Sequence, residues 1–429
     1  MMAALSEITA PVKRLSLPTL ILTGIFALGV NAVWLSYNIF ILPLQVQEVT
    51  SESTKGIVLG GLVGVAIGVA VIVNILAGII SDHSRGRFGR RRPTLVVGMA
   101  LTLPFILLPV FVPLSLPTVI LAYLGMQIFT NVAAGAWQPT LADFVPSTQR
   151  GTSAGIKGVF TLLGSAIGVG VITALFAANL SDVAFILIAS VYAVTTLINA
   201  AGMWKLDKPM PELKPLNLKE VVVDLFHVQK RQGISIFWWF VLGSFLIYMG
   251  VSGFQFFGIY YLESILHITG QDAIARATQI SGLLNLLIGM IFALLAGVLS
   301  DKFGRRNIII ISVLISSIVG LFFPFARTFA VFLGFSAIYS AASGVILSVD
   351  TAFTSDLVPG DEAGKYMAYA NLAVGVANGA APPIFGLILN FQGAPTLTSF
   401  IIFFVVSTLF FISSAFVMGL KVPSDRQRR

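Results

Sequence analysis

The chain has no cysteine among its 429 residues and only three histidines. The absence of cysteine excludes disulfides, thiolate catalysis and cysteine-ligated metal or iron–sulfur sites. The histidines, His83, His227 and His267, are far apart in the sequence and indicate no metal cluster. There is also no Gly-x4-Gly-Lys-Ser/Thr loop for nucleotide phosphates and no nucleophile–base constellation. We therefore expect neither an enzyme nor an ATP-driven pump.

Charge is scarce as well. Only 10% of the residues are charged, whereas an ordinary soluble domain has about 25%. The composition is 57% hydrophobic and the mean hydropathy is +0.94. The apolar runs reach about 20 residues or more, enough for a helix to cross a hydrocarbon core of about 30 Å. They do not show the strict alternation over about 10 residues that is typical of barrel strands. The sequence predicts an all-α protein embedded in a lipid bilayer.

Twelve membrane spans can be predicted. Their residue ranges are 17–45, 56–81, 94–112, 117–144, 153–178, 182–204, 234–262, 273–300, 308–324, 328–355, 366–390 and 397–420. No cleavable signal peptide is apparent, because the short N-terminal segment runs into a span of full length.

Basic residues cluster in alternate loops and so indicate the orientation. The cluster from Arg85 to Arg92, Arg150, the 205–231 loop and the basic tail fall on one side, whereas Lys55, Arg276 and Arg327 fall on the other. The positive-inside rule then predicts that both termini are cytoplasmic, in a multi-pass protein of the plasma membrane. Topology also accounts for the net charge of +8, so we expect no nucleic-acid partner.

Two patterns occur once in each half of the chain. The motif Ser-Asp followed by Phe-Gly-Arg-Arg stands at 81–91 and again at 300–306, and an Asp-x-Val-Pro pattern stands at 143–146 and 356–359. This repeat predicts two six-helix bundles, residues 1–204 and 234–429, related by an axis along the membrane normal. Between them, the hydrophilic segment 205–233 is predicted to be a cytoplasmic linker. Its apolar residues after Pro215 have the spacing of an amphipathic helix on the membrane surface, although a plain linker helix fits equally well.

These motifs resemble those of the major facilitator superfamily. Within it, the chain resembles the sucrose-transporter-like branch, among the glycoside-pentoside-hexuronide:cation symporters. The matching residues are Ser81, Asp82, Arg87, Phe88, Gly89, Arg90, Arg91, Arg92 and Pro93, with Gly29, Val30, Trp34 and Pro43 in the first span and Leu141, Ala142 and Asp143 at the end of the fourth. The resemblance implies the major facilitator fold and solute transport by alternating access between the two bundles.

The sequence departs from that branch at one position. Gln127 stands where the plant sucrose transporters have the aspartate that is thought to carry the coupled proton. An amide does not titrate, so this residue cannot supply the coupling. The chain also lacks the Gly-Pro-x-x-Gly-Gly signature of drug–proton antiporters, which disfavours drug efflux.

The charged residues at the predicted cytoplasmic helix ends form the first candidate site. Arginine–carboxylate pairs at an interface suit a latch that closes the inner side and opens in the other state. The alternative is that these charges only set topology and anchor loops. The predicted gate residues are Asp82, Arg87, Arg90, Arg91, Asp143, Arg150, Asp301, Arg305, Arg306 and Asp356.

Asp350 is the candidate for a coupling residue. It lies six residues inside Asp356 in the tenth span, about 9 Å deeper in the membrane. Carboxylates in the hydrocarbon region are costly and usually line a pathway. The alternative is a third gate residue paired with Lys365 or an arginine. Glu263, at the outer end of the seventh span, we interpret as an acid close to a loop.

Polar and aromatic residues within the spans form the candidate substrate site. They are Asn31, Trp34, Gln127, Asn131, Gln138, Tyr248, Gln255 and Asn285. Amides donate and accept hydrogen bonds, and aromatic faces stack on sugar rings, so the set suits a neutral hydroxylated solute. Each amide can instead be a contact between helices, worth under about 1 kcal/mol.

The sequence thus predicts a secondary transporter that moves a small neutral polar solute, a sugar or glycoside, and that is coupled to protons. An exporter of another small metabolite or drug, or an uncoupled facilitator, remains the alternative. We expect no cofactor beyond a coupling proton or sodium ion, and we expect the monomer to be the functional form.

Overall fold

The computed structural model describes residues 14–84, 88–207, 234–358 and 363–423. All regular elements in these ranges are helical, and twelve helices are long and apolar enough to cross a membrane. This confirms the predicted all-α membrane fold. The predicted amphipathic helix and most of the linker lie outside the described residues.

The first six spans, called the N-half here, run from residue 17 to 202. Several spans are built from consecutive helical segments. The first comprises α2, α3, η2 and α4; the fourth comprises α7 and α8; the fifth comprises α9, η4 and α10. The bounds are α2 Leu17–Gly24, α3 Phe26–Ser36, η2 Tyr37–Ile41, α4 Leu42–Val49, α5 Lys55–Asp82, α6 Arg92–Phe111, α7 Leu116–Trp137, α8 Thr140–Phe144, η3 Ser147–Gln149, α9 Arg150–Ala166, η4 Ile167–Val171, α10 Ile172–Ala177 and α11 Ser181–Gly202.

The last six spans, called the C-half, run from residue 234 to 421. Each consists of one long helix, with a short 3-10 turn after the third. The bounds are α13 Ile234–Ser264, α14 Gln271–Phe303, α15 Arg305–Phe322, η5 Phe323–Phe325, α16 Phe329–Leu357, α17 Ala363–Asn390 and α18 Leu397–Lys421.

The helix starts follow from local sequence. Side chains of Ser16, Ser115, Thr328 and Thr396 accept backbone N–H groups at the starts of α2, α7, α16 and α18. Such caps satisfy donors that have no partner within the helix. The wide turn η2 ends two residues before Pro43, whose ring crowds the carbonyl four residues earlier in a regular α-helix, and a π-helical turn relieves that crowding.

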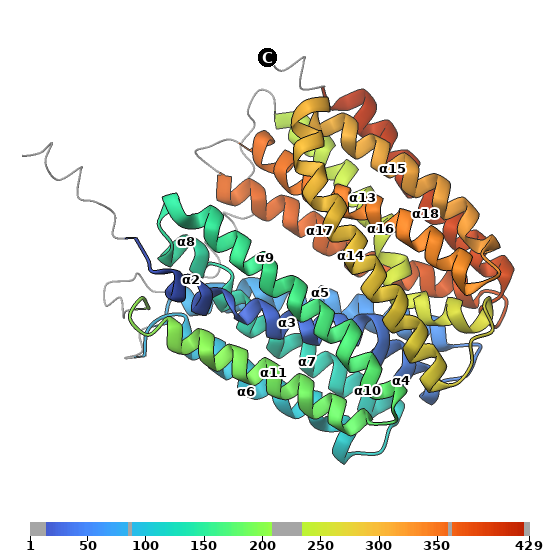
Figure 1. Cartoon of the computed structure of the whole chain (residues 1–429), viewed down its shortest axis with the longest axis horizontal. Helices are drawn as coiled ribbons and strands as arrows, with labels where there is room; N and C mark the ends of the chain where they lie inside the picture. Colours follow the sequence, from blue (N-terminus) through green and yellow to red (C-terminus); the bar gives the residue numbers. More distant parts are fainter. Residues whose placement is uncertain (1–13, 85–87, 208–233, 359–362, 424–429) are drawn as a thin grey trace, which may run out of the picture.

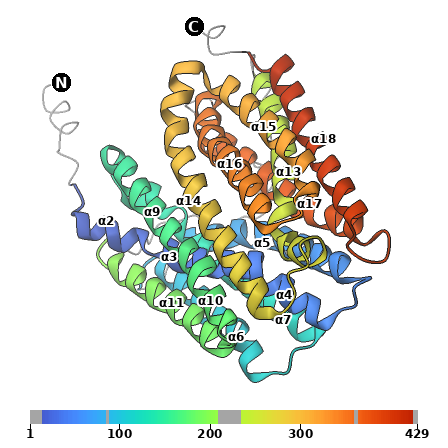
Figure 2. The same cartoon turned by 45° about the vertical axis from the view of Figure 1, so that its right-hand side comes forward.

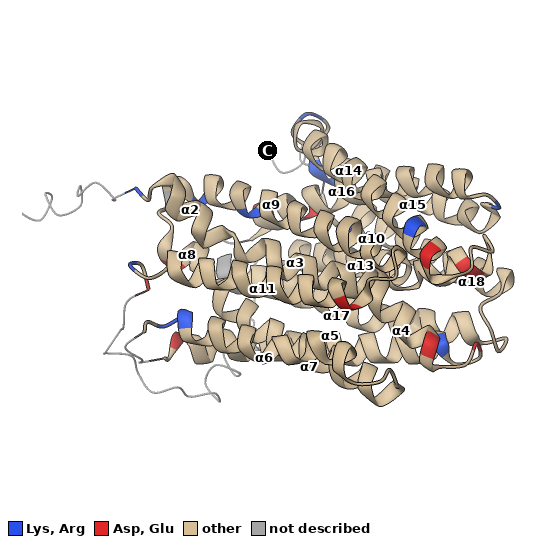
Figure 3. Ribbon diagram, turned by 60° about the horizontal axis from the view of Figure 1, so that its bottom comes forward, with Lys and Arg blue, Asp and Glu red and all other residues tan. Residues whose placement is uncertain are grey.

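Apolar side chains cover the outside of the helices. Phe111, Leu294 and Val298 are more than 70% exposed in the isolated chain, as lipid-facing residues should be. Figure 3 shows that uncharged residues make up most of the ribbon and that Lys, Arg, Asp and Glu lie mainly towards the helix ends. The arrangement fits a bundle with a broad apolar belt.

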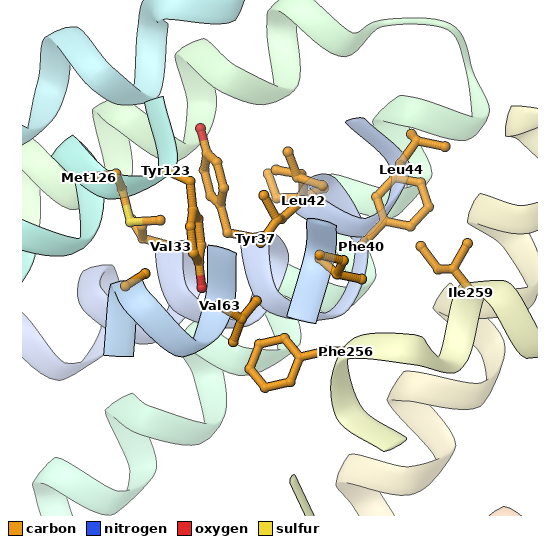
Figure 4. Close-up of a cluster of buried hydrophobic side chains, with 14 of the residues drawn as sticks. Val33, Tyr37, Phe40, Leu42, Leu44, Val63, Tyr123, Met126, Phe256 and Ile259 are labelled. Atoms are coloured by element: carbon orange, nitrogen blue, oxygen red, sulfur yellow. The ribbon is translucent and has the colours of Figure 1, made fainter. Parts of the chain in front are cut away.

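The two halves meet at one end and diverge towards the other (Figures 1 and 2). We call the meeting end, which contains the start of α5 and the end of α17, the sealed end. We call the other, which contains Arg90, Arg91 and Arg305, the arginine-rich end. Apolar packing continues from one half to the other near the sealed end, where Val63 of the N-half and Phe256 of the C-half belong to one buried cluster (Figure 4).

Glycines allow α5 and α17 to cross backbone to backbone. A Cβ at Gly60 would overlap the carbonyl oxygen of Pro382, and one at Gly64 would lie 2.9 Å from the carbonyl oxygen of Gly379. Gly56 and Gly386 form a similar contact. Small residues of this kind let membrane helices approach closely. This crossing is a large part of the contact between the two halves.

Candidate functional site

The backbone of the arginine-rich turn is held by one buried carboxylate, that of Asp207. Its oxygens accept the backbone N–H groups of Arg90, Arg91 and Arg92 at 2.8, 2.9 and 2.9 Å. These donors lie at the start of α6, where the helix dipole favours an anion. Asp207 follows α11, so the contact ties the third span to the sixth. The sequence analysis missed this residue because it falls in the segment predicted to be a linker.

The side chains of the same turn form an ion-pair cluster. The Arg91 guanidinium, whose side chain is 2% exposed, lies 2.8 Å from a carboxylate oxygen of Asp143 and also pairs with Asp82. Arg90 lies 2.6 Å from the same oxygen of Asp143 and 3.7 Å from Asp82. Four of the predicted gate residues therefore come together. Asp82 ends α5, Arg90 and Arg91 directly precede α6, and Asp143 lies in α8.

The other predicted gate residues are distributed differently. Arg305 lies 2.9 Å from Asp356 and also donates to the carbonyl oxygen of Ala352. Arg306 donates to the carbonyl oxygen of Gly419. Arg150 donates to the backbone carbonyls of Ala142 and Val145, at 3.1 and 3.3 Å. Arg87 and the side chain of Asp301 lie outside the described residues.

Each of these ion pairs joins residues of a single half. Asp82, Arg90, Arg91 and Asp143 belong to the N-half, and Arg305 and Asp356 belong to the C-half. The expected latch between halves is thus not made by these pairs at the arginine-rich end, where the halves diverge. A closing role for them stays a prediction about another conformation.

The amides predicted on the fourth span are engaged inside the N-half. Gln127 donates to the hydroxyl of Tyr123 at 3.1 Å, and Tyr123 donates to Asn38 at 3.0 Å. Asn131 donates to the backbone carbonyl of Gln127 at 2.8 Å and accepts from Asn74 at 3.3 Å. Gln127 and Asn131 are both buried. Asn131 thus links α7 to α5, whereas Gln127 bonds within α7 and reaches η2 only through Tyr123.

Four other predicted substrate residues, Asn31, Trp34, Gln138 and Tyr248, do not line the cavity between the two halves. Asn31 donates to the backbone carbonyl of Ala27 at 2.8 Å, and the Trp34 indole N–H lies 3.4 Å from the hydroxyl of Thr130. Gln138 is exposed at the junction of α7 and α8, and Tyr248 is half-buried on α13.

A cavity of about 260 Å³ lies between the two halves. Residues of α3, η2, η4, α13, α14 and α16 line it, and most of them are apolar. The lining consists of Leu35, Ile39, Val169, Phe254, Gln255, Gly258, Ile259, Leu262, Thr278, Ser281, Gly282, Asn285, Leu286 and Phe332. The structure therefore brings two of the predicted substrate residues, Gln255 and Asn285, into one cavity.

Two polar atoms of this lining are buried without a hydrogen-bond partner. They are Oδ1 of Asn285 and Oγ1 of Thr278. Buried polar atoms are rarely left unsatisfied, so these atoms indicate a missing partner such as a ligand or water. The sequence analysis missed Thr278 and Ser281. Thr278, Ser281 and Asn285 follow one another at spacings of three and four residues, which places them on one face of α14 and was a usable signal.

Asp350 is buried in the C-half. The hydroxyl of Ser244 on α13 donates to its carboxylate at 2.6 Å. Among the described residues, Asp350 has no ion pair with a lysine or arginine. The alternative partner Lys365 has its side chain outside the described part. Asp350 does not line the cavity. Ser244, the hydrogen-bond partner of Asp350, lies one helical turn before Tyr248 on α13.

A family model described as Major Facilitator Superfamily matches residues 19–291 and 275–429. Among curated proteins, the chain is 28% identical over 141 residues to the MFS-type transporter clz19 of Cochliobolus lunatus, covering 31% of the chain. It is 30% identical over 132 residues to the riboflavin transporter MCH5 of Saccharomyces cerevisiae, covering 29% of the chain. These matched segments span only 27% and 25% of the two relatives.

Solved structures are similar over nearly the whole chain. A D-xylose-proton symporter superposes with a TM-score of 0.68 at 20% identity, covering 95% of this chain and 97% of that one. The nucleoside transporter NupG gives a TM-score of 0.67 at 14% identity, covering 94% and 98%. At these identities, the likeness supports the fold alone.

Proposed function

Because the chain belongs to the Major Facilitator Superfamily and is a membrane transporter rather than an enzyme, we propose that it is a secondary transporter for a small neutral solute. Its two halves rock about the central cavity, so that the cavity opens alternately to either side of the membrane. The sealed and arginine-rich ends then correspond to the closed and open sides of one conformation. By the positive-inside rule, the open side is the cytoplasm.

The cavity supports the choice of solute class. Its lining has no charged side chain, so a charged solute would have no counter-ion there. Four polar side chains are set into an otherwise apolar wall, and the unpartnered Asn285 Oδ1 needs a hydrogen-bond donor. A hydroxylated ring with one apolar face meets both conditions, as in a small glycoside. The four polar side chains in an uncharged cavity wall are the observation that carries this proposal.

A second solute class is favoured by the same wall. Ten of the 14 lining residues are apolar, so a flat metabolite with few hydroxyl groups would also bury its surface well. One relative is named for riboflavin, and the solved structures are named for D-xylose and nucleosides. Export of such a metabolite is the alternative function.

We also propose that transport is coupled to protons through Asp350. Its carboxylate is buried with a hydroxyl partner and no described cation, which suits a group that gains and loses a proton during the cycle. The resemblance to the sucrose-transporter-like branch agrees with a cation-coupled solute, although Gln127 replaces that branch's aspartate. No other cofactor is proposed, and the proposed functional unit is a monomer in the plasma membrane.

Uptake of radiolabelled solutes into proteoliposomes tests these proposals. A panel of sugars, glycosides, nucleosides and flavins is compared with and without an imposed pH gradient. We expect saturable uptake of a glycoside that the gradient accelerates. Asn285→Ala should raise KM by about tenfold, the effect of one lost hydrogen bond of about 1.4 kcal/mol.

Control variants and outcomes distinguish the identity of the solute from the coupling of transport to protons. Asp350→Asn should abolish the response to the gradient, whereas Asp182→Asn, at an exposed acid of α11, should leave it unchanged. Saturable uptake of flavins or nucleosides alone would establish the alternative solute class. A gradient response that persists in Asp350→Asn would refute coupling through this residue.

A further inference from the structure

Lys55 is a fully buried lysine at the sealed end of the bundle. Its side chain is 0% exposed, and its ammonium lies 2.8 Å from a carboxylate oxygen of Glu263 and 2.7 Å from one of Glu52. The ammonium also lies 4.9 Å from the ring centre of Tyr260. Lys55 belongs to the N-half, whereas Glu263 and Tyr260 belong to α13 of the C-half. This ion pair therefore joins the two halves, whereas the pairs described above at the arginine-rich end each lie within one half.

Both carboxylate oxygens of Glu263 are bound by the opposite half. Oε1 accepts from the side-chain amide of Gln47 at 2.7 Å, and Oε2 faces Lys55. Our interpretation of Glu263 as an acid close to a loop was therefore incomplete. Sequence spacing gave no hint of this contact, because Lys55 and Glu263 are separated by 208 positions.

A second contact between the halves lies beside the first. The Asn390 side chain at the end of α17 accepts the backbone N–H of Gly56 at 2.6 Å and donates to the backbone carbonyl of Glu52 at 2.7 Å. The hydroxyl of Tyr260 donates to the carbonyl of Pro43 at 3.3 Å. The start of α5 is thus held by both α13 and α17.

The position of Lys55 is costly for a residue that only stabilises the fold. It is the first residue of α5, where the helix dipole disfavours a cation, and it has lost all contact with water. A buried ion pair is weak evidence of net stabilisation, because desolvation offsets its attraction. When the halves separate, however, water reaches the buried lysine and hydrates Glu263, now 24% exposed, more fully. The closed and open states can then be similar in free energy. A contact that forms and breaks in every transport cycle requires this similarity.

The ion pair also stands next to the cavity. Ile259 and Leu262 of α13 line the cavity, and Tyr260 and Glu263 follow each of them directly in sequence. In alternating access, a solute leaves towards the sealed end only after the two halves have separated there. That separation breaks the contact between Lys55 and Glu263.

We propose that Lys55, Gln47 and Glu263 form the outer lock of the transporter. The lock forms when the cavity faces the arginine-rich end and breaks when the cavity opens at the sealed end, so its strength sets the populations of the two conformations. This inference rests on the proposed alternating access, and not on the identity of the solute or the coupling ion.

Distances between spin labels test the lock. The chain has no cysteine, so Leu180→Cys and Thr269→Cys place two labels, one at an exposed position of each half, without background. Both positions are in turns at the sealed end, after α10 and before α14. Pulsed electron resonance on the purified full chain in detergent, without solute, gives the distribution of short and long distances.

Glu263→Gln removes the charge with little change in shape and should raise the ratio of long to short distances by about tenfold, a change of about 1.4 kcal/mol. Lys55→Ala should shift the ratio in the same direction. Glu52→Gln is the matched control, because Glu52 is the partner of the same lysine, but it lies in the same half and its side chain is 63% exposed. It should leave the ratio unchanged.

The reversed pair Lys55→Glu with Glu263→Lys adds a rescue. We expect it to restore most of the short-distance population, whereas a lysine that only stabilises the fold gives lower melting temperatures and no shift in distances. An unchanged distance distribution in Glu263→Gln would refute the proposed lock. This test does not depend on whether Lys55→Ala folds. The distance measurement uses no solute. Its outcome therefore stays valid even if none of the sugars is taken up in the proteoliposome assay.

Discussion

The carboxylate of Asp207 accepts the backbone N–H of Arg91 at 2.9 Å, across 116 positions of sequence. Replacing this aspartate tests how far the arginine-rich turn depends on it. Asp207→Ala leaves three backbone donors without their acceptor, so we expect a loss of about 1–3 kcal/mol in stability. Thermal unfolding in detergent should show a clear drop in melting temperature. Asp182→Ala, at an exposed acid in the first turn of α11, serves as the comparison and should cost under about 1 kcal/mol.

Gly89 lies against the same carboxylate with a φ of +93°. Gly89→Ala is therefore disfavoured twice, by the backbone conformation and by the overlap of the new methyl group with Asp207. We expect a destabilisation of about 1–3 kcal/mol. Gly151→Ala is the comparison, because a Cβ at Gly151 meets nothing within 4 Å. Equal melting temperatures for the two variants would contradict the role assigned to this glycine.

Arg91 should not tolerate lysine. Its guanidinium reaches Asp143 through Nε at 2.9 Å and a terminal nitrogen at 2.8 Å, and it also contacts Asp82. A lysine offers a single point charge in place of this fork. We expect Arg91→Lys to lose about 2–4 kcal/mol of stability, because the carboxylates stay partly buried without their full complement of donors. Arg90→Lys, at a more exposed side chain, should cost less than half as much in the same unfolding assay, and the reverse order would refute this account.

The crossing of α5 and α17 offers a comparison of two adjacent glycines. A Cβ at Gly60 would overlap the Pro382 carbonyl, whereas one at Gly61 meets nothing within 4 Å. Gly60→Val should force the helices apart and raise the long-distance population at the sealed end by about tenfold. Gly61→Val faces open space and should leave both the distances and the melting temperature unchanged. Similar behaviour of the two variants would show that the crossing does not hold the halves together.

Much of the fold could be predicted from the sequence. The apolar runs placed every span within a few residues of its helix, because burial in lipid requires a long uninterrupted apolar helix. The repeated Phe-Gly-Arg-Arg motif also predicted a repeated turn. Gly89 and Gly304 both adopt a left-handed backbone, with φ values of +93° and +88°.

The candidate site was harder to predict. An amide in a span can face a cavity or a neighbouring helix, and sequence does not distinguish the two. Asn285 faces the cavity, whereas Asn131 binds within the N-half. The contacts of Asp207 and Lys55 depend on how distant helices pack, and no local pattern encodes that packing. The positive-inside rule treated Lys55 as an exception, although its structural role is among the clearest in the chain.

The glycine crossing near the sealed end also has a mechanical consequence. α5 has 28 residues and is about 42 Å long, and its close contacts with α17 run from Gly56 to Val71. The part of α5 from Ile72 to Asp82 therefore extends beyond the crossing, like the free arm of a lever. A slight change of tilt at the crossing becomes a much larger movement of Asp82 at the far tip. A force applied at that tip has a long moment arm, whereas the same force near Gly60 has almost none.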